Sequence, residues 1–223
     1  MKPAAQLKRA ATNWNSYYAA VPVTARLTRR YIRRVLLRAV ERYARGGPGG
    51  LKIVELGGAN SCVIEAIFRR FPCAEYEVVD KDEYGLSLLR DKVRKSPVPV
   101  RLRCEDVLLL NPPSPARADL VFSLGLIEHF DRDGTDRAIQ VHFDLLRPGG
   151  IAIVTFPTPT TLYGVTRGCI ELMGRWLFHD ERPLEFAEVL GTLQKRGTLL
   201  DSKILWPILL TQGMVVARKH QVW

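Results

Sequence analysis

Short apolar runs alternate with longer segments of mixed polarity along most of this chain. The runs are typical of buried strands, whereas the segments between them repeat apolar positions with helical spacing. The predicted strands cover residues 51–54, 76–80, 100–104, 118–123, 150–155, 198–205 and 213–219. Because strands alternate with helices, the pattern predicts an α/β protein built on a sheet.

An acidic, glycine-containing turn follows the first predicted strand. It begins at Glu55 and continues through Gly57, Gly58 and Ala59 to Ser61. Since three of these residues have no bulky side chain, the backbone can fold back sharply and a ligand can approach it closely. The turn therefore predicts a strand-to-helix junction that admits a nucleotide-like cofactor.

Carboxylates follow the next two predicted strands. Asp80 ends the second strand and can accept hydrogen bonds from both hydroxyls of a ribose. Glu105 and Asp106 follow the third, where a carboxylate can accept a hydrogen bond from the exocyclic amine of adenine. Together these strand ends indicate a cofactor that contains adenosine.

With these residues the chain resembles the class I S-adenosyl-L-methionine (SAM)-dependent methyltransferases, in particular the group of ubiquinone and menaquinone methyltransferases and many natural-product O-methyltransferases. The resemblance extends over 52–219 and includes the Leu-Leu-Arg-Pro-Gly-Gly run at 145–150. Three glycines alternate in the family turn. Here Gly57, Ala59 and Ser61 occupy those positions, so small residues replace two of the glycines.

The resemblance implies a Rossmann-like, seven-stranded, mostly parallel sheet with an antiparallel last strand and helices on both faces. It also implies a helical lid or extension over 1–50 and a methyltransferase core over 51–223, with a cap insertion at 157–182. SAM would contact Glu55, Gly57, Gly58, Ala59, Asp80, Lys81, Glu105, Asp106, Ser123, Leu124 and Gly125.

NAD is the competing cofactor for such a turn. Its fingerprint has glycine at the first, third and sixth positions, which here are Gly57, Ala59 and Cys62. A pyrophosphate also favours a helix N-terminus, whereas a sulfonium cofactor has no phosphate and tolerates bulkier residues. The turn therefore favours SAM over a dinucleotide.

Methyl transfer requires alignment of a nucleophile and removal of its proton. His129 follows the fourth predicted strand, and an imidazole titrates near neutral pH, so we predict it as the base. A structural role, as a helix cap or a backbone hydrogen bond, is an equal alternative. We interpret Glu128 as part of the loop around the methionine group. No metal is expected, because Gly125 replaces the first glutamate of related metal sites.

Aromatic residues indicate the acceptor site. Trp14, Tyr17 and Tyr18 correspond to a lid over cofactor and acceptor in similar enzymes, and the irregular excursion after the fifth strand contributes Tyr163 and His179. Such residues suit a small-molecule or lipid-like acceptor, methylated on oxygen. His179 is also considered as a second base. Burial of the aromatic cluster against the core, or a small helical cap in the excursion, explains the same residues.

The chain has 223 residues, 47% of them apolar, which is enough for one sizeable core. Its net charge of +10 would attract an anionic acceptor, nucleic acid or a negatively charged membrane surface. We predict a helix over 24–45 whose arginines form a solvated outer face. An RNA methyltransferase that uses this helix is an alternative, and so is a noncatalytic SAM-binding module, because of the substituted turn.

Several further segments give weaker expectations. The four cysteines have no paired spacing and are interpreted as small buried residues of a reduced, cytoplasmic protein. No apolar segment follows Met1, so we expect no secretory signal, and 204–210 is too short to cross a bilayer. Trp206 and the basic helix predict peripheral membrane contact, although a buried strand explains the same run. Residues 111–114 are read as a proline-rich loop and 183–196 as a helix.

Overall fold

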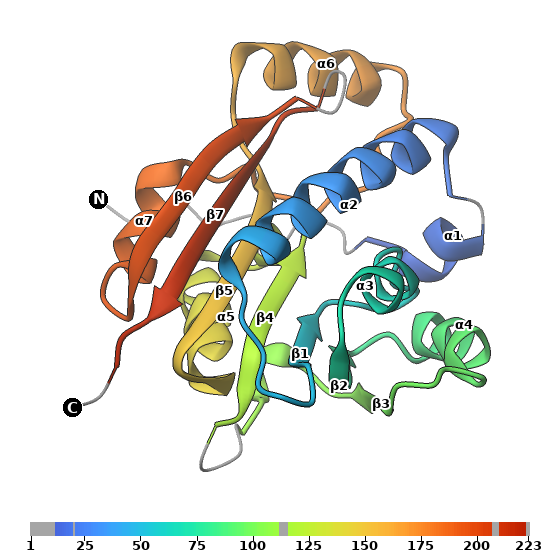
Figure 1. Cartoon of the computed structure of the whole chain (residues 1–223). Helices are drawn as coiled ribbons and strands as arrows, with labels where there is room; N and C mark the ends of the chain where they lie inside the picture. Colours follow the sequence, from blue (N-terminus) through green and yellow to red (C-terminus); the bar gives the residue numbers. More distant parts are fainter. Residues whose placement is uncertain (1–11, 20, 112–115, 207–209, 222–223) are drawn as a thin grey trace.

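The computed structural model describes residues 12–19, 21–111, 116–206 and 210–221, so most of the predicted loop at 111–114 lies outside the described residues. Its centre is one seven-stranded sheet with the strand order β3-β2-β1-β4-β5-β7-β6 (Figure 1). The strands are β1 (Leu51–Leu56), β2 (Cys73–Asp80), β3 (Val100–Cys104), β4 (Ala118–Leu124), β5 (Leu146–Pro157), β6 (Gly197–Leu205) and β7 (Gln212–Lys219).

Strands β1 to β5 pair in parallel, and β7 runs antiparallel to both of its neighbours, β5 and β6. The predicted Rossmann-like, mostly parallel sheet with an antiparallel last strand is therefore confirmed. Because the parallel strands all end at one edge, the loops after β1, β2 and β4 lie close together there.

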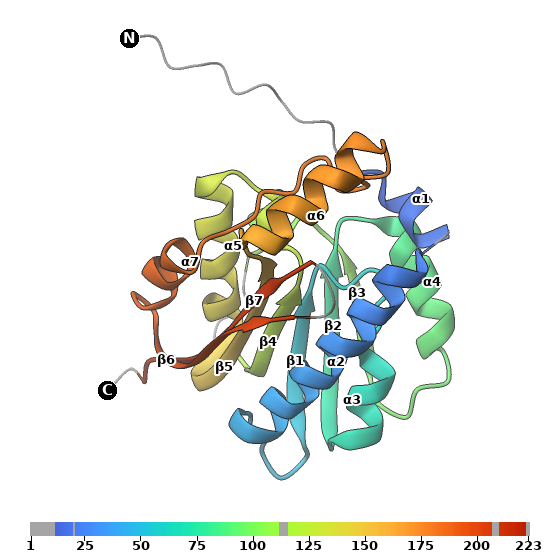
Figure 2. The same cartoon turned by 90° about the horizontal axis from the view of Figure 1, so that it is seen from above.

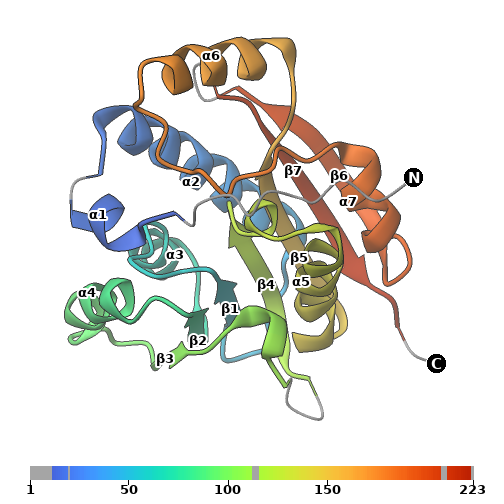
Figure 3. The ribbon, with the colours of Figure 1, turned by 180° about the vertical axis from the view of Figure 1, so that it is seen from behind.

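Helices cover both faces of the sheet. The helical segments are α1 (Trp14–Ala19), α2 (Val23–Tyr43), α3 (Ile64–Arg70), α4 (Glu83–Val93), η1 (Val107–Leu109), η2 (Ile127–His129), α5 (Arg132–Leu145), α6 (Thr161–Leu172) and α7 (Phe186–Leu193). Helices α2, α3 and α4 pack on one face, whereas α5 and α7 pack on the other (Figures 1 and 3).

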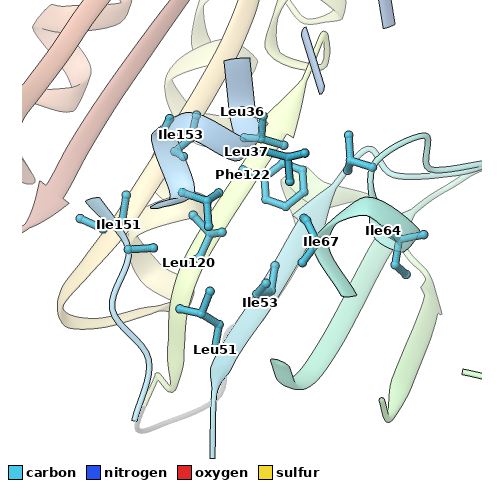
Figure 4. Close-up of a cluster of buried hydrophobic side chains, with 14 of the residues drawn as sticks. Leu36, Leu37, Leu51, Ile53, Ile64, Ile67, Leu120, Phe122, Ile151 and Ile153 are labelled. Atoms are coloured by element: carbon cyan, nitrogen blue, oxygen red, sulfur yellow. The ribbon is translucent and has the colours of Figure 1, made fainter. Parts of the chain in front are cut away.

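The two cores follow from the alternation of side chains along each strand. In β1, Ile53 points toward the core under α2 and α3, whereas Val54 joins the core under α5. Leu36 and Leu37 of α2 reach Leu120 and neighbouring strand residues, as Figure 4 shows. Strands buried on both faces read as continuous apolar runs, which is why they could be located from sequence.

Several predicted boundaries differ from the structure, among them the starts of the fifth strand and of α7. The fifth strand begins at Leu146 rather than at residue 150, with a register irregularity between Ala118 and Leu120 on its neighbour. Helix α7 begins at Phe186, after Glu185, rather than at Pro183. The preceding residues are extended because the backbone N–H groups of Arg182 and Leu184 donate to Glu128 O and Pro157 O.

The prediction that the four cysteines are buried is wrong, because none of them is fully buried. Cys62 and Cys73 are half-buried, but Cys104 and Cys169 are exposed, and all four are free thiols. Cys104 ends the edge strand β3, and Cys169 lies on the outward side of α6. Position in the fold decided their exposure. Within the described parts of the chain, we find no helix with the length and apolar character of a membrane span.

Candidate active site

A cavity of about 910 Å³ lies at the carboxyl ends of β1, β2 and β4. Helices α1, α2 and α6 contribute to its wall and lie over this end of the sheet in Figures 1 and 2. A cavity at the strand ends of an open α/β sheet is where ligands bind in such folds. Most of the predicted site residues line it.

The acidic turn after β1 is held by a buried hydrogen-bond network. Glu55 accepts hydrogen bonds from Ser61 Oγ at 3.1 Å and from the Tyr76 hydroxyl at 2.7 Å. Burial raises the pKa of Glu55 to about 7, although these two hydrogen bonds oppose the shift. Ser61 Oγ also accepts from the backbone of Val63 and Ile64. A serine in place of the family glycine therefore ties the turn to the start of α3.

Two glycines of the turn have no room for a side chain. Gly57 has φ +71°, and a Cβ atom there would lie 2.9 Å from Leu126 Cδ1. A Cβ atom on Gly58 would lie 2.7 Å from both Glu55 Cγ and Val78 Cγ1. The turn therefore needs glycine at both positions. Without side chains, Gly57 and Gly58 present their backbone to the cavity.

Asp80 anchors the turn from the next strand. One of its oxygens accepts from Ala59 N at 2.9 Å and the other from Asp82 N at 2.9 Å. Burial raises the pKa of Asp80, while these backbone hydrogen bonds work in the opposite direction. Asp106 lines the same cavity and accepts from Leu108 N at 2.9 Å. Two carboxylates that sequence assigned to the ribose and adenine thus share one cavity with the glycine turn.

Other predicted cofactor residues divide into two sets. Lys81, Leu124 and Gly125 line the cavity. Glu105 is exposed outside the cavity wall and pairs with Arg103 at 2.7 Å. Ser123 is fully buried, with its hydroxyl 3.0 Å from His142 Nε2, and also lies outside the wall. Glu105 and Ser123 therefore bond to neighbouring side chains and do not line the cavity.

His129 lies in the cavity wall and pairs with Asp180. Its Nδ1 atom is 3.0 Å from Asp180 Oδ1, and Thr12 Oγ1 donates to the same carboxylate oxygen. Burial alone would lower the pKa of His129, but the hydrogen bond to Asp180 and the nearby carboxylates of Glu128 and Glu181 outweigh it and raise that pKa. The imidazole therefore titrates above its ordinary range, in a position to exchange a proton with a bound molecule.

Glu128 adds a carboxylate whose burial the sequence did not reveal. The residue is only 2% exposed and lines the cavity, and its Oε2 atom has no hydrogen-bond partner among the described residues. Burial raises the pKa of Glu128 to about 8, although the neighbouring His129 opposes the shift. A buried polar atom without a partner is costly. It indicates a place where a ligand would supply the missing hydrogen bond.

The predicted aromatic lid lies over the same cavity. Trp14, Tyr17 and Tyr18 all line it, and the Trp14 ring lies edge-on to His129 with 5.1 Å between ring centroids. Phe178 of the cap insertion joins this cluster, with its ring centroid 5.9 Å from that of Trp14. Residues far apart in sequence thereby surround His129 with apolar surface.

The cap insertion places its own predicted residues differently. Tyr163 is buried, lines the cavity and donates its hydroxyl hydrogen to Glu181. His179 is exposed and lies outside the cavity wall, whereas the next residue, Asp180, lines it. His179 was predicted from the sequence because an imidazole can act as a base. In the folded chain it is the neighbouring residue, Asp180, that reaches the cavity.

Helix α2 also contributes to the cavity wall, which the sequence did not predict. Thr28, Arg29 and Ile32 line the cavity, and the Arg29 guanidinium lies 5.1 Å from the centre of the Tyr17 ring. The helical spacing of these residues was visible, but the direction of their face was not. Among the residues that the structure describes, no group of three or more His, Cys, Asp or Glu side chains is placed to hold a metal ion.

Residues 53–150, from β1 to the beginning of β5, match the methyltransferase domain family. No curated protein matches the chain. Among solved structures, the N-methyltransferase NodS from Bradyrhizobium japonicum WM9 has 16% identity and a TM-score of 0.65, covering 87% of this chain and 97% of that one.

Two further structures share the fold. Magnesium protoporphyrin IX methyltransferase (ChlM) from Synechocystis PCC 6803, solved with S-adenosylhomocysteine (SAH), has 13% identity and a TM-score of 0.68, covering 92% of each chain. The 1,6-didemethyltoxoflavin-N1-methyltransferase from Burkholderia thailandensis has 18% identity and a TM-score of 0.66, covering 93% of this chain and 85% of that one.

The matched domain, the strand order and the carboxylates at the strand ends all indicate a methyltransferase fold. Residues 53–150 therefore form a methyltransferase domain, and the chain as a whole has the fold of the SAM-dependent methyltransferases. Its place within the ubiquinone and menaquinone group stays a prediction.

Proposed function

We propose that this chain is a class I SAM-dependent methyltransferase that methylates an oxygen atom of a small, largely apolar or lipid-like acceptor. The observation that carries the proposal is the shared cavity. The glycine turn and Asp80 line it together with His129, Asp180 and several aromatic rings. A mostly apolar wall with a few convergent polar groups is typical of small-molecule sites.

Three parts of the chain would hold the cofactor. Each Asp80 oxygen keeps a lone pair beyond the one used by the backbone of Ala59 or Asp82, so both can accept from ribose hydroxyls. Asp106 would accept from the adenine amine, and the backbone at Gly57 would lie against the methionine part. When bound, the cofactor supplies an electrophilic methyl group attached to sulfur.

The remaining task of the chain is to orient the acceptor and take its proton. Since Nδ1 of His129 faces Asp180, its Nε2 atom is the one available to an acceptor hydroxyl. Asp180 would then stabilise the imidazolium that forms. The aromatic rings of Trp14 and Phe178 would exclude water from this step.

Transfer to nitrogen is the second candidate. It is favoured by the unpartnered Oε2 atom of Glu128, because a buried carboxyl oxygen can accept a hydrogen bond from the N–H of an acceptor. Two of the similar structures are described as N-methyltransferases. Two of the similar enzymes are named for small molecules, magnesium protoporphyrin IX and 1,6-didemethyltoxoflavin, which supports a small-molecule acceptor in either case.

Two alternative functions predicted from the sequence would give different experimental results. Exposed arginines of α2, such as Arg30 and Arg34, could follow a phosphate backbone, so an RNA methyltransferase would bind RNA with steep salt dependence. A noncatalytic module would bind cofactor without turnover. The contacts of Ser61 with Glu55 speak against a degenerate turn.

Calorimetry with SAH and a screen for methylated products test the proposal together. Wild-type protein should bind SAH, and Asp80→Ala should weaken binding about tenfold or more, because hydrogen bonds to a charged group are lost. Cell extract incubated with methyl-labelled SAM should yield a labelled small molecule or lipid by mass spectrometry. His129→Gln should retain SAH binding and lose product. Failure of the wild type to bind SAH would refute the assignment.

A further inference from the structure

Helix α6 presents its apolar side to solvent. Leu162, Val165, Cys169 and Leu172 recur at intervals of three and four residues and therefore share one face, which Met173 extends. Val165 is 61% exposed and Leu172 is 91% exposed. We call these five residues the apolar stripe of α6.

The inward face of α6 is the more polar one. Tyr163 is buried there, and Arg167 bonds to Glu171, to the Tyr163 hydroxyl and to the carbonyl of Glu181. A helix on a protein surface normally has the reverse arrangement, with apolar residues inward. Large apolar residues gathered on an outer face indicate a surface that is covered when the protein works.

Further exposed apolar residues lie at the same end of the molecule. Ile204 and Trp206, at the end of β6, are 42% and 53% exposed. The start of β7 contacts the beginning of α6, since the hydroxyls of Thr211 and Thr160 are 2.7 Å apart. Figures 1 and 2 show α6 above the tips of β6 and β7, on the same side of the molecule as the N-terminal half of α2.

The N-terminal half of α2 adds positive charge. Arg26, Arg30 and Arg34 are exposed, and none of them takes part in an ion pair between described residues. Arg26 and Arg30 line an open hollow of about 430 Å³ with Arg29 and Arg33. Tyr18 and Cys62 also line this hollow, so it borders α1 and the turn before α3. Exposed arginines without an acidic partner among the described residues attract an anionic partner.

We propose that the apolar stripe of α6 and the exposed arginines of α2 dock this enzyme on an anionic lipid bilayer. A bilayer takes up the apolar residues and neutralises the arginines at its headgroups. A second copy of the chain would bring the same positive charge to the interface, and nucleic acid would leave the apolar stripe in water. Charge and polarity together therefore select the lipid surface.

The cavity wall reaches this face. Met173 and Leu177 are 61% and 43% exposed, and both also line the cavity. A lipid-like acceptor could therefore enter from the bilayer without crossing water. This part of the inference rests on the proposed function, whereas the docking itself does not.

Cosedimentation with vesicles tests the docking without cofactor or acceptor. The full chain should bind phosphatidylcholine vesicles that contain phosphatidylglycerol, and binding should decline as salt is added. Val165→Ser combined with Leu172→Ser should lower the partition constant about tenfold or more. Arg26→Gln, Arg30→Gln and Arg34→Gln together should lower it about tenfold or more.

Matched controls come from the opposite edge of the sheet. Leu109 is an exposed apolar residue on η1, and Arg101 is an exposed arginine on β3. Leu109→Ser and Arg101→Gln should leave vesicle binding unchanged. Absence of binding by the wild type, equal losses in the controls, or a dimer in light scattering that Leu172→Ser abolishes would overturn the inference. SAH binding measured on the same samples keeps this result separate from the proposed function.

Discussion

His129 Nδ1 and Asp180 Oδ1 lie 3.0 Å apart, although 51 positions separate the two residues in the chain. The histidine follows β4, and the aspartate belongs to the cap between α6 and α7. Their contact joins the cap to the strand ends at the point where an acceptor would react. The pair resembles the base and its orienting carboxylate found in many acid–base sites.

The first prediction concerns this pair. Asp180→Asn removes a negative charge that favours the imidazolium, so the pKa of His129 should fall toward the value that burial alone would set. NMR titration of the His129 ring measures this directly and needs no acceptor. Once an acceptor is known, the acidic limb of its pH profile should move to lower pH. An unchanged His129 titration would contradict the electrostatic role of Asp180.

The rate prediction for His129→Gln follows separately. If Nε2 takes the proton, turnover should fall by about 10²- to 10⁴-fold while the Kd for SAH stays within about twofold. Steady-state kinetics and calorimetry on one preparation check both values. A loss of SAH binding equal to the loss of rate would show that His129 has a structural role, which was its alternative interpretation from sequence.

Glu128→Gln should change the pH dependence of stability. The pKa of Glu128 is about 8 when folded, well above its ordinary value of 4.5, so between these values the folded state binds more protons than the unfolded state. Stability should therefore decrease as pH rises through this window, by about 1.4 kcal/mol per pH unit at most for this group. Thermal melts at pH 5 and pH 8 should show that the variant loses part of this dependence.

A control separates Glu128 from Glu55, whose pKa is also raised, to about 7. Glu55→Gln should reduce the pH dependence of stability only up to about pH 7. It should also disturb the turn, because Glu55 accepts hydrogen bonds from Ser61 and Tyr76. Curves for the two variants that coincide with wild type would show that neither buried carboxyl carries a shifted proton.

Gly58→Ala should destabilise the protein. The new Cβ atom would lie 2.7 Å from Val78 Cγ1 inside a buried turn, and overpacking of this kind costs roughly 1–3 kcal/mol. SAH binding should weaken as well, because the backbone must move. Gly164→Ala on α6 is the matched control, since no atom lies within 4 Å of its Cβ position, and it should stabilise slightly. Denaturant titration of both variants measures the change in the free energy of unfolding.

Ser61→Gly restores the family glycine and should nevertheless destabilise the protein. The change removes the hydroxyl that donates to Glu55 and accepts from the start of α3, leaving buried groups without partners, at a cost of about 1–3 kcal/mol. Denaturant titration should show lower stability. Improved stability or tighter SAH binding would indicate instead that the serine marks a weakened cofactor site.

Much of the fold could be predicted because its signals are local. Buried parallel strands appear as apolar runs, and their order along the chain with helices between them restricts the sheet to few topologies. The ends of such runs were less certain. The extended start of β5 and the late start of α7 depend on hydrogen bonds with distant strands and loops, such as Leu184 N to Pro157 O.

The candidate site was predictable in part for the same reason. Gly57, Asp80 and Asp106 lie at or within two residues of strand ends that meet at one edge of the sheet, so their proximity follows from topology. Exposure of a side chain does not follow in this way. His179 and Asp180 are neighbours in sequence, but only the aspartate reaches the cavity.

By itself the sequence determined the α/β class, the strand-to-helix turn and the carboxylates at the strand ends, because each depends on residues a few positions apart. Tertiary structure alone decided that Asp180 meets His129, that Glu128 is buried with an unpartnered oxygen, and that α6 turns its apolar stripe outward. These features depend on how the cap packs on the sheet. Burial and contact between distant segments set the pKa values and the exposed surface, and no local pattern encodes them.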